Sequence, residues 1–102
     1  MIHHIIMIKL KSFWRKDDKI EKAEEIKAAL ETLPAKIKEI QFFEVGVNIN
    51  ESERSSDIVL ISKFRNVEDL NRYCINPFHQ SVARIIKEYS TNVSYIDYQT
   101  LS

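Results

Sequence analysis

The segment at residues 2–11, IHHIIMIKLK, constrains the fold most, because it is apolar on both of the faces that a strand would present. Its β-branched residues predict a β-strand. Successive side chains of a strand point to opposite faces, so one face carries Ile2, His4, Ile6, Ile8 and Leu10. The other face carries Ile5 and Met7 at its centre. Such a strand needs an apolar partner on each side.

The segment DDKIEKAEEIKAALETL has the pattern of an amphipathic helix. Its apolar residues recur at intervals of three and four positions, which is the helical period. Asp18 and Glu21 form a D-x-x-E pattern, which predicts that they satisfy the first N–H groups of the helix. Pro34 predicts where the helix ends.

The rest of the chain predicts three more strands and a second helical region. Strands are expected at 40–49, 57–64 and 93–98, with the polar loop NESERSS between the first two. Asn66 predicts a helix cap, and Pro77 interrupts the helix that follows. The order β-α-β-β-α-β is typical of an α+β, ferredoxin-like fold. We expect a single domain over residues 1–102, with one four-stranded antiparallel sheet and the helices on one face.

The opposite face of that sheet predicts a homodimer. Ile5 and Met7 would lie there beside large apolar residues of the second strand, either Phe43, Val45 and Val47 or Phe42. A monomer would expose a larger apolar patch than soluble proteins usually tolerate. A second copy, packed sheet to sheet, would cover the patch and form a dimeric α/β barrel.

Composition argues against several kinds of partner. Lys+Arg and Asp+Glu number 15 each, so no basic surface is predicted for nucleic acid. No apolar run approaches the roughly 20 residues that cross a bilayer, so no membrane partner is predicted. Cys74 is the single cysteine and cannot form an internal disulfide, which favours the cytoplasm. Neighbouring His3 and His4 point to opposite faces, so no metal site is predicted.

The sequence NPFH at 76–79 predicts a helix start with a histidine in its first turn. Pro77 suits the first helical position and Asn76 the N-cap. His79 is then the third helical residue, where the positive end of the helix dipole disfavours imidazolium. A histidine that stays neutral near pH 7 can act as a general base. His79 lies at the margin of the apolar helix face, from which it can reach the space between helix and sheet where His4 lies.

Four stretches, HIIMIKLK, IQFFEVGVN, YCINPFHQ and VSYIDY, resemble in the same order the stress-responsive dimeric α/β-barrel (Dabb) domain family. The resemblance spans nearly the whole chain. The usual pattern of that family at the helix break is His-Pro-x-His; Asn76 stands here at the first histidine and His79 at the second. Some plant members with similar histidine and tyrosine positions are polyketide cyclases without a cofactor. The resemblance therefore implies His4, Tyr73 and His79 as catalytic residues and no cofactor.

Two imidazoles and a phenol in an apolar space can carry out acid–base chemistry on a carbonyl compound. One imidazole removes a proton α to the carbonyl, and the other imidazole or the phenol donates to the developing enolate oxygen. An aldol- or Claisen-type cyclisation, or an isomerisation, fits this chemistry. It needs no metal or redox centre.

Structural interpretations of the same residues stay open. His4 can be a hydrogen-bonded strand residue, Tyr73 a core residue with a bonded hydroxyl, and Phe13 and Trp14 can line an opening or simply pack. The alternative function is a non-catalytic homodimer that binds a small apolar ligand or acts in stress tolerance through a partner. Related barrels include cofactor-free monooxygenases and haem-degrading enzymes, whose pocket residues this chain does not match.

Overall fold

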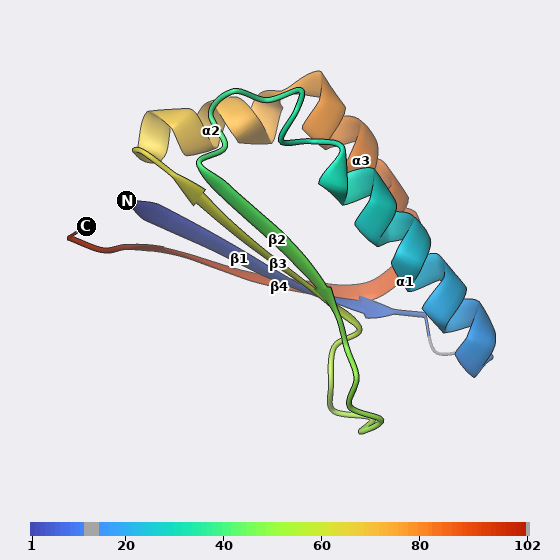
Figure 1. Cartoon of the computed structure of the whole chain (residues 1–102). Coiled ribbons are helices and arrows are strands. Elements are labelled where there is room, and N and C mark those ends of the chain that lie inside the picture. Colours follow the sequence, from blue (N-terminus) through green and yellow to red (C-terminus); the bar gives the residue numbers. More distant parts are fainter. Residues whose placement is uncertain (12–14, 102) are drawn as a thin grey trace.

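The computed structural model describes residues 1–11 and 15–101, which form four strands and three helices (Figure 1). Along the chain these are β1 (Ile2–Leu10), α1 (Lys16–Glu31), β2 (Phe42–Val47), β3 (Ile58–Phe64), α2 (Val67–Ile75), α3 (Pro77–Tyr89) and β4 (Ser90–Gln99). The ferredoxin-like order is confirmed, with the second helical region divided into α2 and α3. The roles suggested for Phe13 and Trp14 fall outside the described residues.

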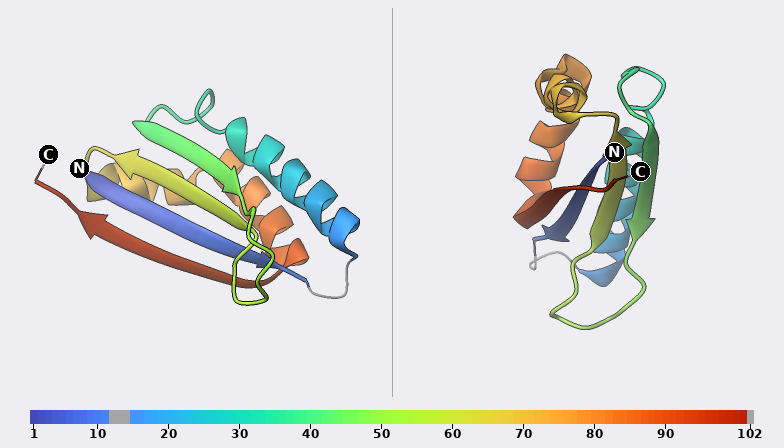
Figure 2. Two further views of the ribbon diagram at one scale, coloured as in Figure 1. Left: turned by 60° about the horizontal axis from the view of Figure 1, so that its bottom comes forward. Right: turned by 90° about the vertical axis from the view of Figure 1, so that its left-hand side faces the viewer.

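The strands form one antiparallel sheet in the order β2-β3-β1-β4. The three helices lie on one face of this sheet, and the other face is open (Figures 1 and 2). In the register of the sheet, His4 stands between Ser62 of β3 and Asp97 of β4. The main chains of Met1 and Thr100 exchange two hydrogen bonds of 3.2 and 3.0 Å, so both ends of the chain lie at one end of the sheet.

The core lies between the sheet and the helices. The predicted core face of β1 is confirmed, since Ile2, His4, Ile8 and Leu10 are buried and Ile6 packs against the same cluster. Ile26 and Leu30 of α1 and Phe64 of β3 are also buried there. Each such apolar side chain stabilises the fold by about 1.5–3 kcal/mol. In residues 1–11 and 15–101, we find no helix with the length and apolar character needed to cross a membrane.

The start of α1 differs from the prediction. The helix begins at Lys16, with Arg15 at the N-cap position and no side-chain cap. Asp18 therefore lies inside the first turn, where it accepts a hydrogen bond from Arg15 Nε at 3.1 Å. The D-x-x-E capping prediction was wrong because the helix starts before Asp18. Carboxylates in a first turn still interact favourably with the helix dipole.

The predicted caps of α2 and α3 are confirmed. The Asn66 side chain accepts a hydrogen bond from the Asp69 N–H at 2.9 Å. The Asn76 side chain accepts one from the Phe78 N–H at 2.9 Å, and Pro77 occupies the first turn of α3. Because Asn76 is extended, it ends α2 and starts α3 in a new direction.

The open face of the sheet carries exposed apolar side chains. Met7 of β1, Phe42 of β2, and Ile96 and Tyr98 of β4 are 47, 41, 57 and 41% exposed. Of the two sets of β2 residues predicted for this open face, the structure places Phe42 there. The other set, Phe43, Val45 and Val47, packs against the core on the helix face. The register explains this outcome, since Phe42 pairs with Lys63 whereas Phe43 pairs with the buried Ser62.

Candidate active site

A cavity of about 710 Å³ lies between α3 and the helix face of the sheet. His4, Tyr73 and His79 all line it, although they come from β1, α2 and α3. Its apolar walls are formed by Ile6, Ile8, Leu30, Leu60, Val82, Ala83, Ile86 and Val93. The structure therefore brings the three predicted site residues together in one apolar space.

His4 is held by a carboxylate on the neighbouring strand. Its ring is buried, and its Nδ1 is hydrogen-bonded to the Asp97 carboxylate directly across on β4. A carboxylate only accepts, so Nδ1 carries the proton and the ring orientation is fixed. The opposite nitrogen, Nε2, is then the one available to a ligand. The main-chain carbonyl of His4 accepts a hydrogen bond from Ser62 Oγ at 3.1 Å, which anchors the strand beneath the ring.

His79 has the properties of a neutral imidazole. Its Nδ1 donates to the Cys74 carbonyl at 3.1 Å, because a carbonyl can only accept. Burial lowers the pKa of His79 below its ordinary value, and the nearby charge of His4 acts in the same direction, against the opposing effect of the hydrogen bond. The sequence predicted a neutral ring from the helix dipole; in the structure, burial is the largest cause of the lowered pKa. With Nδ1 protonated, Nε2 is the basic atom.

Tyr73 neighbours both histidines and is fully buried. Its ring centroid is 4.3 Å from that of His79 and 6.1 Å from that of His4. Within the described residues, its hydroxyl has no hydrogen-bond partner, so the expectation of a bonded hydroxyl was wrong. Burial also raises the pKa of Tyr73, which keeps the phenol protonated. A buried donor without a partner costs about 1–3 kcal/mol, so a ligand oxygen that accepted from it would be stabilised.

The comparisons with known proteins match this chain to one family. The model of the stress responsive A/B barrel domain, Dabb, matches residues 2–100. The chain belongs to the Dabb family. Comparison with the curated proteins gave no match.

Solved structures share the fold of this Dabb chain. A dimeric protein of unknown function with a ferredoxin-like fold, from Bacteroides fragilis NCTC 9343, is 33% identical, with a TM-score of 0.88 over 97% of this chain and 95% of that one. A dimeric ferredoxin-like protein from Thermobifida fusca is 19% identical, with a TM-score of 0.82 over 97% and 90%. The hydroxynitrile lyase of Passiflora edulis is 15% identical, with a TM-score of 0.80 over 99% and 94%. The similarities to the last two proteins are evidence for a shared fold only.

Sequence reasoning missed two residues of the Dabb cavity, Asp97 and Tyr95. Both lie on β4 on the same side as His4, and the Tyr95 ring centroid is 6.3 Å from that of His4. The alternation of Val93, Tyr95 and Asp97 along β4 placed these side chains on one face. An acidic residue at the end of such a series was the signal that could have indicated a partner for His4.

His3 does not belong to the site. It lies on the open face of the sheet, where Nε2 is 3.0 Å from Thr100 Oγ1 and the ring stacks on Tyr98 at 4.7 Å between centroids. The two adjacent histidines thus point to opposite faces, as the alternation predicts. Among residues 1–11 and 15–101, no group of three or more His, Cys, Asp or Glu side chains is placed to hold a metal ion.

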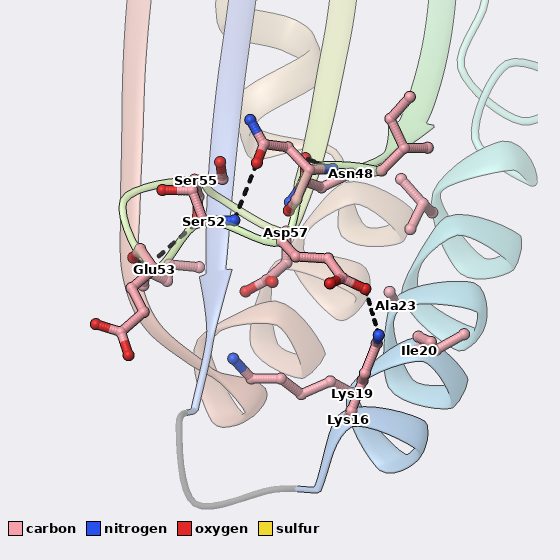
Figure 3. Close-up of a pocket in the computed structure, with 14 residues that line it drawn as sticks. Lys16, Lys19, Ile20, Ala23, Asn48, Ser52, Glu53, Ser55 and Asp57 are labelled. Atoms are coloured by element: carbon pink, nitrogen blue, oxygen red, sulfur yellow. Dashed lines mark hydrogen bonds and ion pairs between the residues drawn. The ribbon is translucent and has the colours of Figure 1, made fainter.

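A second cavity, also about 710 Å³, lies between α1 and the loop that joins β2 to β3 (Figure 3). Lys16 is ion-paired with Glu51 across it. Lys9 Nζ donates to the main-chain carbonyls of Glu53 and Ser55, and Asp57 accepts from the Leu10 N–H at 2.7 Å. These contacts tie the loop to β1 and α1. None of the predicted site residues lines this cavity.

Proposed function

We propose that this Dabb protein is a cofactor-free lyase or cyclase that acts on a small, polyketide-like carbonyl compound by acid–base chemistry. One observation carries the proposal: the ring of a neutral, half-buried His79 lies 4.3 Å from the ring of Tyr73, whose hydroxyl has no partner among the described residues, in a cavity that His4 also lines. For this chemistry, a ligand in the cavity must reach both the imidazole base and the buried phenol donor. The apolar walls limit water and strengthen electrostatic interactions at the carbonyl.

The reaction begins with proton removal by His79. Its Nε2 takes a proton from the carbon α to the carbonyl, and the electron pair of that C–H bond moves to form the enolate. The developing oxyanion accepts a hydrogen bond from the Tyr73 hydroxyl, or from Nε2 of His4 when that nitrogen carries a proton in addition to the one on Nδ1. The enolate carbon then attacks a second carbonyl in the same molecule, and the new alkoxide takes a proton from His79. This sequence closes a ring with no net gain or loss of protons.

Asp97 prepares His4 for this role. With Nδ1–H held by the carboxylate, Nε2 of His4 is the nitrogen that faces a ligand. The buried position of His4 limits other orientations. That the same fold carries a hydroxynitrile lyase supports the proposal only in showing that such a barrel can hold a lyase site.

The proposal includes a homodimer in the cytoplasm. The open face of the sheet carries Met7, Ile96 and Tyr98, all more than 40% exposed, and the 33% identical relative is dimeric. The double variant Met7→Lys/Ile96→Lys should sediment as a monomer in analytical ultracentrifugation, whereas the wild type should sediment as a dimer. Lysine in place of Ile75, which is 71% exposed but lies on α2, serves as the matched control and should leave the dimer intact. Equal sedimentation of the double variant and the wild type would contradict this interface.

The alternative is a non-catalytic homodimer that binds a small ligand or acts in the stress response. One observation favours it: the side chain of Asn76, which stands where the resemblance places a first histidine, is engaged in capping α3. That position therefore contributes no acid or base to the cavity.

A cyclisation assay separates the two functions. The probe is a linear diketone whose carbonyls are separated by three methylene groups, and its ring closure is followed by NMR. We expect the wild-type protein to accelerate closure and His79→Gln to lose about 100-fold or more of that acceleration. His3→Gln, on the opposite face of the sheet, is the control and should match the wild type. Closure at the uncatalysed rate with wild-type protein would favour the non-catalytic alternative.

A further inference from the structure

The residues that line the active-site cavity extend along α3 and β4 from the histidines to a second polar end. The residues of α3 that line it are His79, Val82, Ala83, Ile86 and Lys87, a single helical stripe. His79 and Lys87 are eight positions apart, which is about 12 Å along a helix axis. The opposite wall runs along β4 from Asp97, which holds His4, to Asn92 and Ser90 near the other end. Apolar side chains separate the two ends.

The charges at the two ends differ. Asp97 is the acidic side chain of the described lining, and it is engaged with His4 at the catalytic end. Lys87 is exposed at the far end and, within the described residues, makes no ion pair or side-chain hydrogen bond. Ser90 and Asn92 add neutral polar groups beside it. The far end therefore has a positive side chain without an ion pair among the described residues, in the last turn of α3, whereas the centre is apolar.

We propose that the ligand of this cavity is an elongated keto acid, with its carbonyl at the histidines and its carboxylate at Lys87, about 12 Å away. The inference rests on the proposed function, since that function places the carbonyl beside His79. The alkyl segment between the two groups packs along Ile8, Val82 and Ile86. Lys87 is then a specificity-determining residue that selects acids over neutral ketones of the same length.

The test measures binding and is independent of turnover. The probes are oxoundecanoate with its ketone next to the terminal methyl group, and the primary amide of the same acid, titrated by calorimetry at low salt. We expect the wild type to bind the acid about three- to fivefold more tightly than the amide, as for a partly exposed ion pair. Lys87→Gln should abolish that preference and leave the affinity for the amide unchanged.

Arg84→Gln is the matched control, because Arg84 is an exposed cation on the same helix that does not line the cavity. This variant should keep the preference for the acid. Equal affinities of the wild type for acid and amide, failure to bind either probe, or equal losses in Lys87→Gln and Arg84→Gln would each overturn the inference. If the preference is present but no proton abstraction is found, the keto acid site stands and the catalytic proposal fails.

Discussion

Asp97 of β4 lies directly across the sheet from His4 of β1, and its carboxylate holds the Nδ1 proton of that ring. The pair joins the C-terminal strand to the strand that begins the chain. It also fixes which nitrogen of His4 faces the cavity. This contact makes the edge strand β4 part of the site as well as part of the sheet.

Asp97→Asn should alter His4 without unfolding the protein. An amide can donate to Nδ1, which would move the ring proton to Nε2 and remove the negative partner of a protonated His4. We expect a loss of about 10- to 100-fold in any cavity-dependent reaction, the range for residues that orient a functional histidine. Nitrogen-15 NMR of the histidine ring reports the tautomer directly. An unchanged tautomer in this variant would show that Asp97 does not control His4.

Tyr73→Phe should separate activity from stability. The Tyr73 hydroxyl is buried and has no partner among the described residues, so its removal deletes no hydrogen bond of the folded protein. We expect the free energy of unfolding in urea to stay within about 1 kcal/mol of the wild type, or to rise. The cyclisation rate should fall, because the enolate loses a donor. A stability loss well beyond that range would mean that the hydroxyl is bonded inside the protein.

The pH dependence follows from His79. Its pKa is lowered in the folded protein from an ordinary value of 6.5, chiefly by burial. The unfolded chain therefore binds more protons than the folded one between the lowered pKa and 6.5, so stability rises with pH across that window and is fully present above it. Urea unfolding between pH 4 and 8 measures this slope, which should become smaller in His79→Gln.

The rate of the catalysed reaction should also depend on the protonation of His79. Neutral His79 is the active form, so the acid limb of the rate profile should lie below pH 6.5. An NMR titration of the His79 ring checks the assignment. A midpoint above 6.5 would contradict the buried, neutral imidazole on which the mechanism depends.

Two asparagine caps offer a matched test of the helix break. Asn66→Ala and Asn76→Ala each remove a side chain that accepts a main-chain N–H at 2.9 Å. Each should cost about 1 kcal/mol of unfolding free energy. Asn76→Ala should in addition reduce activity, because α3 positions His79 through its first turn, whereas Asn66→Ala should not. Equal activity of the two variants would show that the cap of α3 has no effect on the site.

The sequence predicted the features that depend on local periodicity and chemistry. The alternation in residues 2–11 placed His4 on the core face, and the Asn-Pro pair placed His79 in the first turn of α3. Long-range pairing was harder to predict. A shift of one residue reverses every side chain of a strand, which is why the choice between Phe42 and Phe43 stayed open until the register was known.

The contact of His4 with Asp97 was not predicted for a related reason. It joins residues at opposite ends of the chain, and only the pairing of β1 with β4 brings them together. That the Tyr73 hydroxyl has no partner within residues 1–11 and 15–101 likewise depends on packing among α2, α3 and the sheet, and no local pattern reports it. The start of α1 was misplaced because Asp18 lies inside the first turn and Glu21 beyond it, so the D-x-x-E pattern does not mark the N-cap here.

The most direct measurement is hydrogen–deuterium exchange at the α-carbon of a long-chain methyl ketone, followed by proton NMR in deuterated buffer. It reports proton abstraction alone and needs no knowledge of the natural substrate. The account predicts that the wild-type protein accelerates exchange, that His79→Gln removes about 100-fold or more of the acceleration, and that His3→Gln keeps it. Exchange no faster than in buffer, or equal exchange in His79→Gln and the wild type, would contradict the role of His79 as the catalytic base.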